Sequence, residues 1–218
     1  MNFKLIGLIL ITFTIFVVYA IFAFVPPVEG LGYLVRIAFF HIPVAWVSVL
    51  AFLVSAITAA QYLKTRNLKY DHLSAYSAKL GLIFCLLAVV SGAIFAKLTW
   101  GAYWNWDPRQ TTIFILCLIY GAYLSLRPTI EDEDRRATIA AVYALMSFLT
   151  VPFLVFVIPR MYFSLHPEPV LNSAGRLDMD TVMLYVLLAA VSLCSSIYCY
   201  LLAHSVSKKF TCTKEMKT

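Results

Sequence analysis

Tryptophan is concentrated in one short segment of this sequence. Trp100, Trp104 and Trp106 are three of the four tryptophans in 218 residues, and Asp107 and Arg109 follow them directly. One interpretation is an aromatic belt, in which indole rings lie at a lipid–water interface. The other is a platform of aromatic faces with one carboxylate and one guanidinium, which suits a flat, apolar and partly anionic ligand. The density of rings in one long linker favours the platform.

Asp107 also has the sequence pattern of a helix N-cap. Pro108 occupies the first helical position of the pattern, and Gln110 stands three residues after Asp107, as in a capping box. A cap here would fix the direction in which the chain enters the next helix, and it would therefore aim the tryptophans. The capping and ligand-binding roles of Asp107 are compatible.

Two of the four histidines stand where they could bind a metal. His41 lies inside an apolar stretch, where an imidazole leaves polar nitrogens unpaired and is usually functional. His166 lies six residues after Arg160, just beyond another apolar stretch. Two alternatives stay open: His41 could be a structural histidine whose nitrogens are hydrogen-bonded, and His166 could be a loop residue without a function. His72 and His204 lie in polar flanking sequence and are expected to be solvated.

The elements that must position these residues are membrane helices. Hydrophobic residues make up 62% of the chain and charged residues 13%, far from the roughly 45–50% and 25% of soluble proteins. A water-soluble core protein is therefore excluded. Six stretches free of Asp, Glu, Lys and Arg are candidates to cross a bilayer: Leu5–Val25, Ile37–Leu63, Leu80–Ala96, Thr111–Leu126, Ala137–Pro159 and Thr181–Ala203.

These stretches predict an all-α integral membrane protein with six transmembrane helices in a single domain over residues 1–218. The tryptophan segment, residues 97–110, lies between the third and fourth helices. A helix needs about 20 residues to cross about 30 Å of hydrocarbon, so the third and fourth stretches are short unless they use flanking residues such as Lys97.

The basic residues predict an orientation. Twelve of the 17 Lys and Arg flank one side of the predicted bundle, and five flank the other. Cytoplasmic loops carry the excess of basic residues, so both termini are expected in the cytoplasm. The linkers expected on the outer face are Pro26–Arg36, Lys97–Gln110 and Arg160–Asp180. Membrane topology thus explains the formal charge of +6, and the expected partner is the lipid bilayer rather than nucleic acid.

This topology brings His41, the tryptophan segment and His166 to one face at about the same depth. Two imidazoles from different helices beside aromatic rings are what a bis-histidine haem site requires, with one axial nitrogen on each side of the iron. Zinc would normally want a third or fourth ligand nearby. We therefore predict non-covalent haem b with His41 and His166 as its axial ligands.

Haem propionates would seek guanidinium groups on the same face. The outer-face candidates are Arg36, Arg109, Arg160 and Arg176. Each of them could instead be an interface anchor whose long side chain snorkels to the headgroup region.

The segment Trp100-Gly101-x-x-Trp104-x-Trp106-Asp107 resembles the tryptophan-rich WWD motif of haem-handling membrane proteins. The second span reads Arg36-Ile37-x-Phe39-x-His41-Ile42-Pro43-x-Ala45-Trp46, and a second outer histidine follows the fifth span. With six spans, nearly the whole chain is similar to the CcmC family, the haem exporter protein C of cytochrome c maturation.

The resemblance implies a haem-binding and transfer protein rather than an enzyme, with lyase-like assistance to covalent loading of a chaperone left open. It implies haem held at the outer face of the bacterial inner membrane by His41 and His166 and delivered to the periplasmic haem chaperone CcmE. It also implies the ABC transporter subunits CcmA and CcmB and the small membrane protein CcmD as partners. The residues that it places against the porphyrin are Trp100, Gly101, Trp104, Trp106 and Asp107.

The main alternative is a two-haem transmembrane electron carrier of the cytochrome b type. It would hold an outer haem on His41 and His166 and an inner haem on His72 and His204. The sequence Lys69-Tyr70-Asp71-His72 is too polar for a haem pocket, which argues against the inner site. One haem per chain rather than two would reject this alternative.

Overall fold

The computed structural model describes residues 3–166 and 179–215, with side chains as far as residue 207. This part of the chain folds into helices joined by short connections. In chain order they are α1 (Phe3–Phe24), the 3-10 helix η1 (Tyr33–Ile37), α2 (Ala38–Thr65), α3 (Leu68–Trp100), α4 (Pro108–Leu126), the 3-10 helix η2 (Arg127–Thr129), α5 (Glu133–Pro152), the π-helix η3 (Phe153–Val157), α6 (Ile158–Met161) and α7 (Thr181–Glu215). Six helical spans are long and apolar enough to cross a membrane, which confirms the predicted fold class of a multi-pass helical membrane protein.

Helix α3 is longer than the charge-free stretch predicted. The prediction was Leu80–Ala96, whereas the helix covers 33 residues. Its first turns carry charged residues, and one of them, Asp71, is buried because Arg127 binds its carboxylate through both terminal nitrogens at 2.8 and 2.7 Å. A paired charge can be buried within a helix bundle. The absence of charge was therefore too strict a criterion for the start of this helix.

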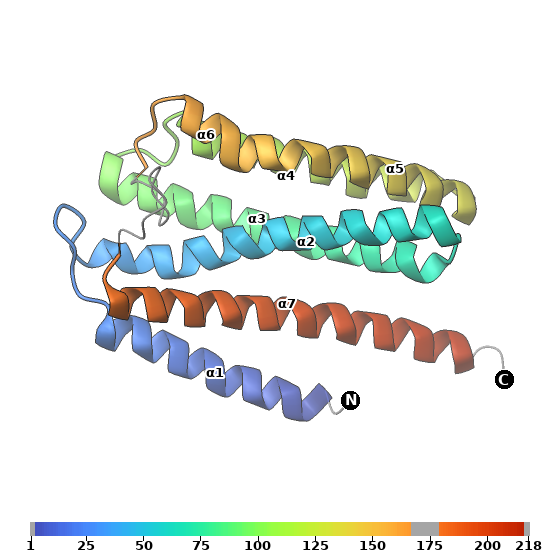
Figure 1. Cartoon of the computed structure of the whole chain (residues 1–218), viewed down its shortest axis with the longest axis horizontal. Coiled ribbons are helices and arrows are strands. Elements are labelled where there is room, and N and C mark those ends of the chain that lie inside the picture. Colours follow the sequence, from blue (N-terminus) through green and yellow to red (C-terminus); the bar gives the residue numbers. More distant parts are fainter. Residues whose placement is uncertain (1–2, 167–178, 216–218) are drawn as a thin grey trace.

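The helices form an elongated bundle whose two termini lie at the same end (Figure 1). The connections α1–α2 and α3–α4 and the segment that follows α6 gather at the opposite end. Helix α1 lies at the edge of the bundle beside α7. The described parts of the three predicted linkers thus lie at one end, while the side of the membrane that this end faces stays a prediction.

Helices α2 to α5 share the largest buried core. Small side chains allow close approach of the backbones, as is usual where helices pack in a membrane. On α3, a Cβ at Gly81 would lie 2.6 Å from the ring of Phe52 on α2, so only glycine admits that ring. The Phe52 ring stacks on Tyr120 of α4 with a centroid distance of 3.5 Å. On α5 four of the five buried members of this core are alanines, Ala137, Ala140, Ala141 and Ala144, and the fifth is Val151.

The fifth span changes its helical form shortly before the connection to α7. Helix α5 ends at Pro152, η3 follows as one π-helical turn, and α6 begins at Ile158. Proline removes a backbone donor and disturbs the regular hydrogen bonds, and π-helical turns hold an extra residue and are frequent near functional sites. This segment leads the chain to Arg160 and then to His166.

Candidate functional site

The carboxylate of Asp107 joins two distant parts of the chain. It caps α4 by accepting from the N–H of Arg109 at 2.9 Å, which confirms the predicted N-cap with Pro108 at the start of the helix. It also accepts from Nδ1 of His166 at 2.9 Å, from the N–H of Leu165 at 2.7 Å and from the Ser164 hydroxyl at 2.9 Å. With a side chain only 1% exposed, Asp107 fixes the position of His166 through this one group.

The electrostatics of this pair determine which nitrogen of His166 is available. Burial alone would raise the pKa of Asp107, but the N–H groups of Arg109 and Leu165 and the nearby imidazole hold that pKa below its usual 3.8. Burial lowers the pKa of His166, and this outweighs the opposing attraction of Asp107. At neutral pH an ionised carboxylate therefore faces a neutral imidazole. The single ring proton is on Nδ1, toward Asp107, and Nε2 keeps its lone pair.

His41 on α2 is supported by α3. Its Nδ1 lies 3.0 Å from the hydroxyl oxygen of Ser91, and that hydroxyl donates to the carbonyl of Leu87 at 2.7 Å. Because the Ser91 proton is used in this way, the oxygen accepts from Nδ1–H of His41. The imidazole also interacts with the carbonyl of Ala88, which can only accept. Both contacts direct the ring proton toward α3 and make Nε2 the nitrogen with the lone pair.

Gly92 provides the space for the His41 ring. A Cβ at this position would lie 3.1 Å from Cε1 and 3.5 Å from Nδ1 of the imidazole. The ring therefore rests against the backbone of α3, and any larger residue at position 92 would push it outward.

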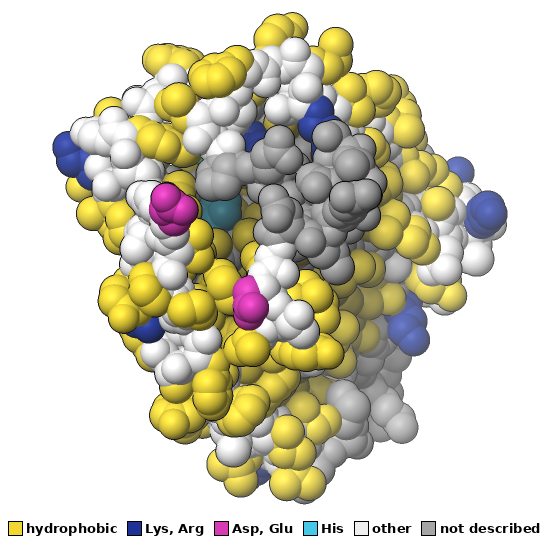
Figure 2. Space-filling view, turned by 60° about the vertical axis from the view of Figure 1, so that its left-hand side comes forward, with side chains coloured by type: hydrophobic (Ala, Val, Ile, Leu, Met, Phe, Trp, Pro, Cys, Tyr) yellow, Lys and Arg dark blue, Asp and Glu magenta, His cyan; other side chains and the backbone are white. Residues whose placement is uncertain are grey.

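The two histidines belong to one site. Their imidazoles lie within electrostatic range of each other, and Arg109 lies within range of both. They come from α2 and from the segment after α6, as the sequence predicted. Figure 2, which turns this end of the bundle forward, shows a histidine side chain set back from the surrounding surface, with apolar side chains beside it.

The tryptophan segment meets the histidines through Trp100. Trp100 is the last residue of α3, and its ring contacts the His166 imidazole edge to face with a centroid distance of 5.0 Å. Gly101 ends α3 in the left-handed conformation, with φ +83°, that glycine adopts readily. Trp104 contacts Trp106 at 5.8 Å and Phe114 of α4 at 5.7 Å.

Trp106 has an unusual backbone. Its φ of +56° lies in the left-handed region, which costs a residue with a Cβ about 1–2 kcal/mol. Its side chain is 77% exposed, so burial does not offset that cost. Gln110 braces the turn by accepting from the N–H of Asn105 at 3.0 Å and donating to the carbonyl of Tyr103 at 3.3 Å. The predicted capping-box glutamine thus bonds the turn before the cap instead of the cap itself. Strain of this kind is common at functional sites.

The predicted arginines differ in their surroundings. Arg109 is half-buried and lies within electrostatic range of Arg160 as well as of the two histidines. Arg160 donates to the carbonyl of Phe156 at 2.8 Å. Two guanidinium groups so placed repel each other, and an anion near them would relieve the repulsion.

Arg36 stabilises the connection between α1 and η1. It donates through Nη2 to the carbonyls of Phe22 at 2.9 Å and Val25 at 3.1 Å, and its guanidinium lies 4.3 Å from the centre of the Tyr33 ring. These contacts fasten the end of α1 to η1. A contact of Arg36 with a propionate stays a prediction, and Arg176 lies outside the described residues.

The other two histidines have unrelated neighbours. His72 is half-buried rather than solvated, and its Nδ1 lies 3.9 Å from the Asp71 carboxylate. His204 is exposed, and its ring contacts Phe3 at 5.0 Å and Tyr200 at 5.9 Å. His72 lines a cavity bordered by α3, α5 and α7, and the ring of His204 contacts Phe3 of α1, so the two rings have different neighbours.

Three supporting residues were not predicted from the sequence: Ser91, Gly92 and Ser164. Ser91 is the only hydroxyl residue in the stretch 80–96, and with Gly92 it forms a polar and small pair among large apolar residues. This small, polar pair within an apolar stretch could have indicated that another helix packs closely against α3 there. Ser164 stands two residues before His166, a spacing that suits a local turn but does not reveal Asp107 as its partner.

The fold and this end of the bundle define a multi-pass helical membrane protein with a histidine pair beside a tryptophan-rich turn. The family model described as Heme exporter protein C matches residues 2–218, and the chain belongs to this family.

Individual relatives agree with the family. The chain is 31% identical over 157 residues to the Heme exporter protein C of Bradyrhizobium diazoefficiens, which covers 72% of this chain and 59% of the relative. It is 34% identical over 133 residues to the Heme exporter protein C of Paracoccus denitrificans, covering 56% and 54%. It is also 35% identical over 96 residues to the Cytochrome c biogenesis protein CcsA of Spinacia oleracea, covering 44% and 29%. These alignments span about three fifths or less of each relative's own length.

Proposed function

We propose that this protein binds haem at the His41–His166 end of its helix bundle and hands it to the chaperone CcmE during cytochrome c maturation. The observation that carries the proposal is that the two imidazoles make the same kind of hydrogen bond. Each uses Nδ1 for a hydrogen bond inside the protein, to Ser91 or to Asp107, which leaves Nε2 for iron. Histidines that bind metals commonly have this second hydrogen bond, which fixes the ring.

The surrounding residues suit the rest of a haem molecule. Indole rings at Trp100, Trp104 and Trp106 offer apolar and aromatic surface to a porphyrin. Arg109 and Arg160 offer two cationic groups for the propionates, and their mutual repulsion favours an anion between them. The family membership and the relatives' names, which speak of haem export and cytochrome c biogenesis, support the same cargo.

Transfer requires a site that releases what it binds. A position at the end of the bundle would let a partner reach the haem edge directly, whereas a site in the middle would require the helices to part. We therefore propose presentation at the surface rather than passage through the six helices. By the distribution of basic residues, this end faces the periplasm of a bacterial inner membrane, and CcmA, CcmB and CcmD are the proposed membrane partners.

Haem titration of the purified protein tests the ligand assignment. We expect one haem per chain and a six-coordinate low-spin spectrum, which His41→Ala and His166→Ala should each abolish. His204→Ala is the matched control, because His204 is exposed and its ring contacts Phe3 and Tyr200, away from the candidate site. Retention of the wild-type spectrum in both site variants would contradict the proposal. Two haems per chain, one of them lost in His204→Ala, would instead support the cytochrome b alternative.

Transfer is tested separately with isolated CcmE. Haem-loaded wild-type protein should lose its haem spectrum as CcmE gains one, and a Trp104→Ala variant that still binds haem should transfer it more slowly. If the protein bound haem but transferred none to CcmE, the proposed haem site would stand and the proposed delivery to CcmE would be rejected.

A further inference from the structure

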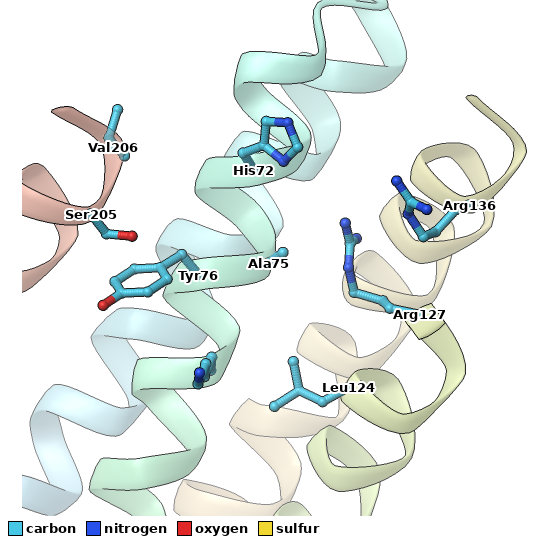
Figure 3. Close-up of a pocket in the computed structure, with 9 residues that line it drawn as sticks. His72, Ala75, Tyr76, Leu124, Arg127, Arg136, Ser205 and Val206 are labelled. Carbon is cyan, nitrogen blue, oxygen red and sulfur yellow. The ribbon is translucent and has the colours of Figure 1, made fainter. Parts of the chain in front are cut away.

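A cavity lies at the end of the bundle opposite the candidate haem site. Its volume is about 380 Å³, and its walls come from α3, from the end of α4, from α5 and from α7. Figure 3 shows Arg127 and Arg136 extending from one side, His72 on α3, and Ser205 on α7. Nothing in the proposed haem function uses this cavity.

The lining of the cavity is cationic. It includes His72, Lys79, Arg127 and Arg136, and none of the described residues that line it is acidic. The bidentate bond to Asp71 neutralises Arg127 from behind, and the Glu133 carboxylate lies 3.5 Å from Arg136 and is half-exposed. Among the residues that the structure describes, no carboxylate is paired with Lys79, so the uncompensated positive charge of the cavity comes mainly from Lys79, with a part from Arg136.

The rest of the lining is apolar or weakly polar. Ala75, Leu124 and Val206 supply hydrocarbon surface, and Tyr76 and Ser205 supply hydroxyl groups. A small, fully hydrated anion would gain nothing from contact with this hydrocarbon surface. A phosphodiester attached to glycerol and acyl chains can use both kinds of surface.

The depth of Lys79 also favours a lipid. Helix α3 has 33 residues and is therefore about 50 Å long, against about 30 Å of hydrocarbon. Lys79 lies about 16 Å from the start of the helix, so its side chain begins near the edge of the hydrocarbon and reaches the layer of lipid phosphates. Lys79 is exposed, so a lipid can approach it.

We propose that this cavity binds the phosphate headgroup of an anionic phospholipid, with Lys79 and Arg136 as its cationic contacts. Basic pockets between transmembrane helices on the cytoplasmic side are suited to such headgroups. The excess of basic residues assigns this end of the bundle to the cytoplasmic leaflet, where anionic lipids would be available. The inference is independent of the haem proposal, because it depends on the other end of the molecule.

Native mass spectrometry of the full-length protein in detergent tests the lipid site. Titration with phosphatidylglycerol should give a tighter complex than titration with zwitterionic phosphatidylcholine. Lys79→Gln should weaken phosphatidylglycerol binding about fivefold, the effect of about 1 kcal/mol per basic residue near a membrane surface. Lys79→Arg keeps the charge and should keep the binding.

The matched control is Lys64→Gln, which removes an exposed lysine near the same end that does not line the cavity. It should leave phosphatidylglycerol binding unchanged. Equal binding of both lipids, or equal losses in Lys79→Gln and Lys64→Gln, would overturn the proposal. If millimolar inorganic phosphate displaced bound phosphatidylglycerol completely, the proposal would also be overturned, because the ligand of the cavity would then be a free anion rather than a lipid.

Discussion

The two histidines of the candidate site are held in opposite ways. His166 lies outside the helices and is fixed by a charge, since the buried Asp107 carboxylate binds both its ring and the backbone beside it. His41 lies inside α2 and is fixed by shape, since its ring rests on Gly92 and its side-chain hydrogen-bond partner among the described residues is the neutral hydroxyl of Ser91.

This difference predicts unequal ligands. A carboxylate on Nδ1–H increases the electron density at Nε2 more than a hydroxyl does, so His166 is expected to be the stronger donor to iron. His41 is expected to be the ligand that exchanges first when haem leaves. Removing the charge of Asp107 should therefore weaken haem binding through His166, and adding volume at Gly92 should weaken haem binding through His41.

The largest effect is expected from Asp107→Asn. Asparagine still caps a helix, so α4 should keep its start, but the negative charge that faces Nδ1–H of His166 disappears. Haem affinity should fall about 10- to 100-fold, the usual cost of losing such a supporting group, and the reduction potential of the bound haem should rise. Haem titration and a potentiometric titration measure the two effects.

The matched control for this charge is Asp132→Asn, which changes the exposed N-cap of α5 in the same way. It should alter neither haem affinity nor potential. If Asp107→Asn behaves like this control, the carboxylate has no role beyond the cap.

A smaller effect is expected from Gly92→Ala. The added Cβ would lie 3.1 Å from Cε1 of His41 and should displace the ring by a few tenths of an ångström. Overpacking of this kind costs about 1–3 kcal/mol, so we expect roughly a tenfold loss of haem affinity. Alanine also favours a helix over glycine by about 1 kcal/mol, so thermal stability without haem should not fall.

Gly121→Ala on α4 is the control for Gly92→Ala, because a Cβ there meets nothing within 4 Å. It should leave the haem affinity as it is. Equal affinities in the two alanine variants would mean that the His41 ring has more room than its contacts indicate.

The smallest effect is expected from Ser91→Ala, which removes one neutral hydrogen bond to His41. About 1 kcal/mol, or roughly a fivefold loss of haem affinity, is the expected cost, and the reduction potential should hardly change. Ser192→Ala, at an exposed serine that bonds only its own helix, is the control. A shift in potential as large as that of Asp107→Asn would show that the two supports are equivalent after all.

The fold could be predicted from the sequence because hydrophobicity and charge act over long stretches. Six apolar runs predicted the six spans, and the placement of His41 and His166 at one end followed from the number of crossings between them. Helix ends were predicted less well, because the pair Asp71–Arg127 buries charge in a way that becomes visible only when α3 and α4 are side by side.

The residues of the candidate site were chosen from the sequence, and their role in binding haem stays a prediction, whereas the contacts between them could not be predicted. Asp107 was recognised as a cap from its neighbours in sequence, but its bond to His166 crosses more than fifty residues. Gly92 and Ser91 act on His41 through the packing of α3 against α2, and the rotation of two helices relative to each other is set by many side chains together. Local patterns contain no information of that kind.

The π-helical turn η3 bears on how this site could change. A π turn contains one residue more than the α-helical path requires, and each residue of a helix advances the chain by about 100° around the axis. Because the turn absorbs its extra residue locally, deleting one residue from Phe153–Val157 would restore regular α-helix and leave Arg160 and the approach to His166 facing as before, whereas deleting one residue from the regular helix α5 would rotate them by about 100°. The geometry of this half of the site is therefore open to alteration by an insertion or deletion within the span, without any change to the residues that contact the cargo.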